Sequence, residues 1–131
     1  MGYIQMATES VEQRVDVLRQ TITASVRRAG PDLSARQLSV FLTSYLEDEA
    51  QTVRGLAAKL NVSKPAITRA LDRLSEFDLV RRKTDRSVLV QRTVSGTTFM
   101  LDLKKILADA GKDTARVPTT ARRTGALVGA A

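Results

Sequence analysis

Residues 63–73 carry hydroxyl and cationic side chains of the kinds that bind a polyanion. The set is Ser63, Lys64, Thr68, Arg69 and Arg73, with Pro65 expected on the same exposed face. Lysine and arginine attract phosphates, and an arginine such as Arg69 is long enough to donate two parallel hydrogen bonds to O6 and N7 of guanine. A serine just before a helix can hold a phosphate through its hydroxyl, together with the free N–H groups of the first turn. The chemistry that this segment supports is recognition of double-stranded DNA.

A second basic group lies in a predicted β-hairpin. The β-branched runs 79–83 and 88–92 predict two strands joined by the polar residues 84–87. Arg86 falls at the tip, where we expect it to enter a minor groove, because narrow A·T tracts concentrate negative potential there. The further residues expected to meet DNA, mostly at phosphates, are Thr52, Arg54, Arg82 and Lys83.

Five helices are predicted from apolar residues that recur every three or four positions. They cover about 10–29, 34–47, 52–60, 64–77 and 93–110. Ser10 with Gln13, and Ser34 with Gln37, match the capping box that begins a helix, and Gly111 is expected to end the last one. Two short helices with a tight turn, followed by a hairpin, predict a mainly α winged helix-turn-helix with flanking N- and C-terminal helices.

The two flanking helices carry long apolar stripes. The first stripe is Val11, Val15, Leu18, Ile22 and Val26, and the second is Phe99, Leu103, Ile106, Leu107 and Ala110. Such stripes form the core of a domain more often than an interface, but together they exceed what one small winged domain needs. We therefore expect part of this surface to meet a second copy of the chain in a two-fold homodimer.

Charge is distributed unevenly along the 131 residues, which carry a net charge of +7. Residues 1–53 have a net charge of −2, residues 54–92 of +6 and residues 111–131 of +3. Segregated positive charge favours a nucleic acid over a membrane as partner. We expect a flexible N-terminus (1–9), a winged domain with dimerisation helices (10–110) and a flexible basic tail (111–131).

The absence of His, Cys and Trp narrows the classes of function. Ser–His and Cys–His catalysis, structural zinc and disulfides are excluded, and no acidic pair lies at a pocket-like apolar position. We therefore expect no enzyme, cofactor or metal site; the acidic residues 47–49 are interpreted as a solvated loop, and the pair Arg27–Arg28 as solvated surface. Apolar runs are too short to span a membrane, and no secretory signal is visible, so we expect a cytoplasmic protein.

The stretch 52–94 resembles the DNA-binding core of the MarR family of bacterial regulators. The matching pieces are LAAKL (56–60), VSKPAITR (62–69), LDRL (71–74), LVRR (79–82) and the wing pair Asp85–Arg86. The resemblance implies that Arg86 is the minor-groove arginine and that residues 63–73 present the major-groove face. It also implies a homodimer joined by the first and last helices, with room for a small-molecule effector that no residue identifies. The chain departs from the family in a short wing, in Asp78 where glycine is usual, and in an abbreviated C-terminal helical region.

A winged helix that binds only protein, for example one acting on the transcription machinery without a specific operator, is the alternative. That function predicts an apolar or acidic recognition face. Lys64, Arg69 and Arg86 favour DNA instead.

Overall fold

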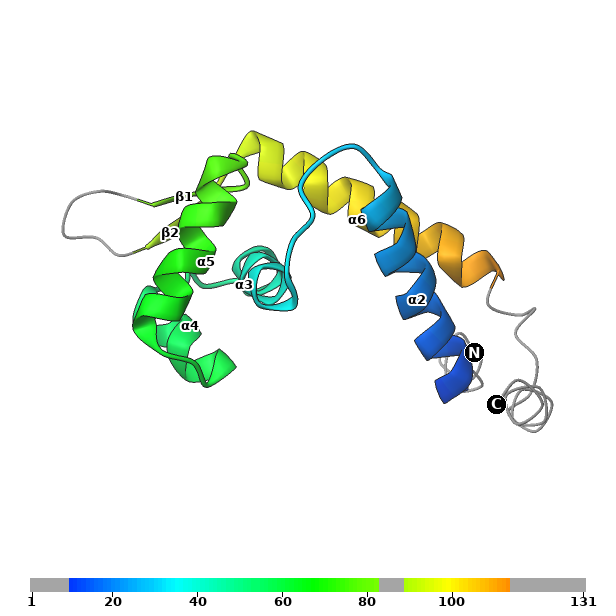
Figure 1. Cartoon of the computed structure of the whole chain (residues 1–131), viewed down its shortest axis with the longest axis horizontal. Helices are drawn as coiled ribbons and strands as arrows, with labels where there is room; N and C mark the ends of the chain where they lie inside the picture. Colours follow the sequence, from blue (N-terminus) through cyan, green and yellow to red (C-terminus); the bar gives the residue numbers. More distant parts are fainter. Residues whose placement is uncertain (1–9, 83–88, 114–131) are drawn as a thin grey trace. The chain divides into compact units, whose positions relative to one another are not determined.

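The computed structural model describes residues 10–82 and 89–113 of the chain (Figure 1). This part forms five helices and one two-stranded antiparallel hairpin, in agreement with the predicted class. It divides into two compact units, residues 30–102 and the described residues on either side of them. The predicted N-terminal segment, the hairpin tip 84–87 and the tail from 114 onward lie outside the described residues.

The unit of residues 30–102 contains the predicted winged helix-turn-helix. Its elements are α3 (Ala35–Leu46), α4 (Val53–Leu60), α5 (Lys64–Glu76), β1 (Val80–Arg82), β2 (Val90–Arg92) and the first part of α6 (Val94–Asp113). Helix α5 packs on α3, α4 and β1, as can be followed in Figure 1. The side chains that this packing encloses completely are Val40, Phe41, Leu56, Ile67, Leu71, Leu74 and Val80.

The turn between α4 and α5 is built from three local signals. Thr52 caps α4 by accepting a hydrogen bond from the Gly55 N–H at 2.9 Å. Asn61 ends that helix in the left-handed region, with φ of 54°, which asparagine tolerates better than most residues. Ser63 then caps α5 by accepting from the Ala66 N–H at 3.3 Å, so only Asn61 and Val62 lie between the last residue of α4 and this cap. Local chemistry therefore sets where α5 begins.

The hairpin follows α5 through a second left-handed residue, Asp78, with φ of 57°. This conformation explains why glycine would also fit at that position. The strands pair in the register Val80↔Arg92, Arg81↔Gln91 and Arg82↔Val90. A further pairing, which the sequence did not predict, is an isolated bridge between Thr52 and Leu89.

The second unit contains α2 (Val11–Arg27) and the C-terminal part of α6. Ser10 and Gln13 form the predicted capping box, with bonds of 2.9 and 3.1 Å. Helix α2 turns a polar and small face, including Gln20 and Ala24, toward Ile106 and Ala110 of α6, around a cavity of about 170 Å³. Its apolar stripe lies on the opposite side and remains exposed, with each residue 49–67% accessible to solvent.

Two expectations for the flanking helices change in the structure. The α2 stripe is not core within the described chain, whereas Phe99, Leu103 and Ala110 of the second stripe are buried. Gly111 does not end the last helix, which continues to Asp113. A helical glycine costs only about 1 kcal/mol relative to alanine, and no atom lies within 4 Å of where a Cβ at Gly111 would be, so nothing local forces a stop.

Candidate nucleic-acid interface

The exposed face of α5 gathers most of the predicted DNA-binding residues. One side of the helix is anchored in the core through Ala66, Ile67, Ala70, Leu71 and Leu74, all at most 6% exposed. This fixes the opposite side toward solvent, where Ser63, Lys64, Pro65 and Arg69 are exposed and Thr68 is half-buried. The sequence therefore predicted correctly which face of α5 is free.

Arg69 presents an exposed side chain on this face. Among the described residues it forms no ion pair or hydrogen bond, and the backbone that carries it lies between the buried Ala70 and Ile67. A rigid backbone with an unpaired, five-donor head group is the arrangement that bidentate recognition of a guanine edge needs.

Arg73 is held differently from Arg69. Its Nη1 donates to Glu76 Oε2 at 2.8 Å, and its guanidinium lies 4.7 Å from the centroid of the Phe77 ring. Both members of the ion pair are more than half exposed, so the pair is weak and its partner can be exchanged for a phosphate. Arg73 therefore fits a phosphate contact near the C-terminal end of α5 better than base reading.

The residues expected at the start of α4 take two separate roles. Thr52 is half-buried, and its hydroxyl already accepts the Gly55 N–H, so it is engaged in capping the helix. Arg54, in the first turn of α4, is exposed. Only Arg54 presents an unengaged side chain at this end of the helix-turn-helix, among the residues that the structure describes.

Arg82 connects the hairpin with α5. Its Nη1 lies 3.7 Å from Asp72 Oδ1, and its side chain is 34% exposed. The pair links the C-terminal end of β1 to the helix face beside Arg69. Lys83 and Arg86 lie outside the described residues, so their predicted contacts remain predictions.

Three further residues, Arg92, Lys59 and Tyr45, join the elements around this surface. Arg92 donates from Nε to the Ser44 carbonyl at 3.0 Å and from Nη2 to the Glu47 carbonyl at 2.8 Å, which binds β2 to the C-terminal end of α3. Lys59 donates to the buried Gln51 side chain at 2.8 Å. Tyr45 bonds to the backbone on both sides of the hairpin base. No local sequence signal marks these pairs, because their partners are 8 to 48 residues away.

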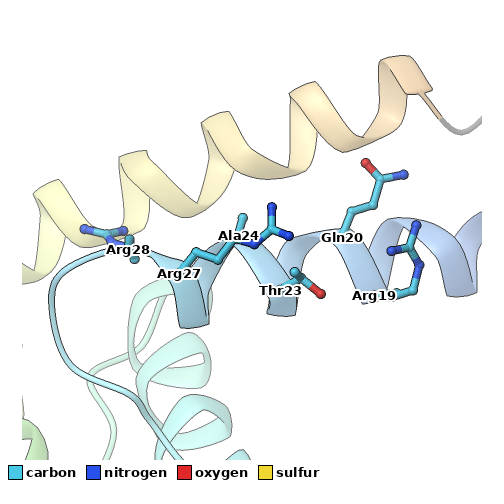
Figure 2. Close-up of a pocket in the computed structure, with 6 residues that line it drawn as sticks. All are labelled: Arg19, Gln20, Thr23, Ala24, Arg27 and Arg28. Carbon is cyan, nitrogen blue, oxygen red and sulfur yellow. The ribbon is translucent and has the colours of Figure 1, made fainter.

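A separate hollow of about 610 Å³ lies along α2 (Figure 2). Its lining residues are Arg19, Gln20, Thr23, Ala24, Arg27 and Arg28. Arg19 is paired with the buried Asp16 at 2.6 Å, and Arg27 is exposed. The sequence predicts solvated surface for the pair Arg27–Arg28; in the structure Arg27 is exposed, Arg28 is half-buried, and both line this groove.

Neither a metal site nor a membrane span is found in the described ranges. There is no group of three or more Asp, Glu, His or Cys side chains placed to hold a metal ion among these residues. None of the helices described is both long and apolar enough to cross a bilayer.

The fold and the cationic face of α5 define a winged helix-turn-helix of the DNA-binding type. The MarR family model matches residues 33–87. A MarR-family transcriptional regulator from Rhodococcus sp. RHA1 is 27% identical, with 86% of this chain and 81% of that chain covered and a TM-score of 0.57. Residues 33–87 therefore match the MarR family of transcriptional regulators, and the fold is shared with a solved regulator of that family.

Two further solved structures illustrate the range of relatives. CouR from Rhodococcus jostii RHA1, bound to p-coumaroyl-CoA, is 26% identical, with 86% of this chain and 79% of that chain covered and a TM-score of 0.56. MepR, a transcription regulator of the Staphylococcus aureus multidrug efflux pump MepA, is 15% identical, with 97% and 90% covered and a TM-score of 0.59, and so shares the fold alone. No curated protein matches the chain.

Proposed function

We propose that this protein is a transcriptional regulator that binds specific operators in double-stranded DNA. The single observation that carries the proposal is the exposed face of α5, where Arg69 is unpaired among the described residues and the helix is anchored by a fully buried opposite side. In this proposal, α5 (about 64–77) enters the major groove and the wing (84–87) enters the adjacent minor groove. Arg69 reads a base edge there.

Phosphate contacts on either side of Arg69 set the register of the helix on DNA. Ser63 and Lys64 lie at the start of α5, where free N–H groups and the helix dipole favour an anion. Arg54 extends the contact to α4, and Arg73 extends it toward the end of α5. Arg82, Lys83 and Arg86 provide the wing contacts. These contacts carry affinity without sequence information.

The competing function, a winged helix that binds only protein, is less well supported. An interface for protein has a core depleted in charge and enriched in aromatic residues. The exposed face of α5 has Lys64, Arg69 and Arg73 instead, and its nearest aromatic, Phe77, lies under the Arg73 guanidinium.

We also propose that the active form is a two-fold homodimer. Five apolar side chains of α2 are about half to two-thirds exposed. All five are Val, Leu or Ile, and full burial of such a side chain contributes about 1.5–3 kcal/mol. A straight apolar stripe that faces away from its own unit is self-complementary when two copies meet about a two-fold axis. A second copy of the chain is therefore the occupant that we assign to this stripe.

A small-molecule effector is the remaining part of the proposal. The groove along α2 is lined by three arginines, a glutamine and a threonine, and the exposed Arg27 gives it a positive charge that favours an anionic ligand. The relative CouR was solved with p-coumaroyl-CoA, a ligand that carries phosphates. Binding of p-coumaroyl-CoA or free coenzyme A, measured by calorimetry and abolished in Arg27→Gln, would support an anion site; equal binding by Arg27→Gln would remove it.

A shift assay on genomic fragments over a salt series tests the main proposal. We expect a few fragments to be bound roughly 10³-fold or more tightly than the rest at physiological salt. Binding of all fragments with one affinity and one steep salt dependence would leave only phosphate attraction and overturn operator recognition. Because the chromosome of a bacterium lies in its cytoplasm, we place the protein there, at the nucleoid when it is bound to DNA.

A further inference from the structure

The base of the wing ends one residue pair earlier than its register allows. The strands pair at Val80↔Arg92, Arg81↔Gln91 and Arg82↔Val90. The next pair in the same register would be Leu79 and Thr93, where an antiparallel ladder would place another backbone bond. The two backbones are instead bridged there by a side chain.

The hydroxyl of Tyr45 forms this bridge. It accepts a hydrogen bond from the Thr93 N–H at 3.0 Å and donates to the Leu79 carbonyl at 2.7 Å. The donor and acceptor that would bond directly in a longer ladder are therefore joined through one oxygen atom. Since that oxygen occupies the space between them, it also fixes how far apart the two strands are at their base.

Tyr45 is itself held rigidly from the side of α3. Its ring lies 4.5 Å from the ring of Phe41, which meets Phe99 edge-on at 5.1 Å. The Arg92 guanidinium lies 5.6 Å from the Tyr45 ring centroid while it bonds to two carbonyls at the end of α3. The hydroxyl thus transmits the position of α3, on which α5 packs, to both strands of the wing.

The first turn of α6 leaves room for this hydroxyl. A Cβ at residue 96 would collide with the Tyr45 hydroxyl and with the Leu79 carbonyl, so glycine is needed for the close approach. Thr93 caps the same turn by accepting from the Gly96 N–H at 2.9 Å and donates to the Asp78 carbonyl at 2.5 Å. Four segments of the chain, from α3 to α6, therefore converge on one hydroxyl group.

We propose that Tyr45 is a positioning residue for DNA recognition, whose hydroxyl sets the spacing of the wing strands and thereby aims the wing relative to α5. The proposal rests on the proposed function, because it assumes that the wing contacts DNA. The aromatic ring alone would fill the cluster with Phe41 equally well as phenylalanine, so the hydroxyl is the group with this role. Tyr45 contacts no DNA itself in this proposal.

The Tyr45→Phe variant tests the role without changing the ring. Direct closure of the ladder, or separation of the strands, changes the hydrogen exchange of the Thr93 and Gln91 amides, while amides in the middle of α5 exchange as before. Affinity for the specific fragment falls by about 2- to 10-fold, the range expected for hydrogen bonds of ordinary strength. Phe41→Leu is the matched control, because it loosens the same aromatic cluster and leaves the hydroxyl in place.

A double-mutant cycle separates positioning from simple stabilisation. Tyr45→Phe should add little loss of affinity to Arg86→Ala, since both act through the wing, and should add its full loss to Arg69→Ala. Unchanged exchange at Thr93, an affinity loss no larger than that of Phe41→Leu at equal stability, or full additivity with Arg86→Ala would each overturn the inference. If the wild-type protein bound no specific DNA, the proposed function would fail, while the exchange experiment would still report on the strand spacing.

Discussion

At the scale of single residues, the arginines of the proposed interface differ in the partners that their side chains already have. Arg69 is unpaired among the described residues, whereas Arg73 is paired with Glu76 and Arg82 with Asp72. The sequence places these arginines on the recognition helix and the wing, but it does not show their partners. Their different partners now predict that replacing each one affects DNA binding in a different way.

Arg69→Ala should weaken binding to the specific fragment by ~1–3 kcal/mol and relax the preference at one base position, because two hydrogen bonds to a guanine edge are removed. Competition titrations with base-substituted operators measure both effects. Arg36→Ala, which removes an exposed arginine from the first turn of α3, is the control for removal of one positive charge. Equal weakening on specific and random DNA by Arg69→Ala would show that Arg69 contacts only phosphate.

Arg86, predicted at the tip of the wing, should affect DNA binding in a different way from Arg69. Arg86→Ala should reduce affinity chiefly for operators with A·T-rich flanks, since a narrow minor groove holds an inserted arginine most strongly. Titrating pairs of operators that differ only in their flanks measures this preference. A reduction that is independent of the flanks would argue against minor-groove insertion.

At the scale of elements, local signals explain what could be predicted from the sequence. The starts of α2, α3, α4 and α5 follow from Ser10, Ser34, Thr52 and Ser63, each of which bonds to an N–H three residues away. The hairpin follows from its β-branched runs and their polar connection, and the buried face of α5 follows from the helical period. Each of these features depends on residues that are close together in the chain, so it can be predicted from a single sequence.

Other features depend on distant partners or on what covers a surface. The Tyr45 bridge joins residues 34 and 48 positions apart, and no pattern in the sequence specifies such pairs. The stripe on α2 was visible as apolar, but periodicity cannot say whether core or partner covers it. The groove lined by Arg27 and Arg28 could not be predicted either, because the sequence does not show which face of a helix borders a hollow.

The recognition helix depends on its buried side for rigidity, and this predicts a large stability effect. Leu71 is completely buried on α5, which packs against α3 and α4, so Leu71→Ala should lower the free energy of unfolding by ~2–5 kcal/mol. Chemical denaturation followed by circular dichroism measures the change. Leu46→Ala, at a leucine 64% exposed on α3, should stay within about 0.5 kcal/mol of wild type. Similar effects at both positions would contradict the observed core.

At the scale of the whole molecule, charge is separated from the apolar contact surface. The net charge of +6 lies within residues 54–92, while residues 1–53, which include the α2 stripe, have a net charge of −2. The exposed stripe of α2 consists of uncharged Val, Leu and Ile side chains, so two copies can approach along it while the basic segment of each copy remains free to meet DNA. The basic tail, residues 114–131, should add only to the attraction for DNA.

Removal of residues 114–131 should make the salt dependence of DNA binding shallower and leave the ranking of operators unchanged. The deletion takes away Arg116, Arg122 and Arg123, each of which can neutralise one phosphate, and the slope should fall by up to ~0.9 for each phosphate that is no longer neutralised. Lys112 is retained, because it lies within α6 and is 3.7 Å from Asp109. A large drop in melting temperature on truncation would show a structural role for the tail.

The exposed α2 stripe leads to the prediction that concerns the assembly as a whole. Leu18 lies mid-stripe and is 57% exposed in the chain, so Leu18→Glu should leave the fold intact and place two carboxylates against each other at a two-fold interface. We expect a monomer in light scattering at micromolar concentration, together with loss of specific DNA binding. The two events are coupled because a dimer reads half-sites about 34 Å apart, roughly 10 base pairs centre to centre, and one module alone buries only about 600–1,000 Å² on DNA. Leu46→Glu puts the same charge on a similarly exposed leucine of α3 and should preserve the dimer, as should Arg69→Ala. A wild-type monomer that protects a single half-site would refute the dimer, and a dimeric Leu18→Glu would move the interface away from α2.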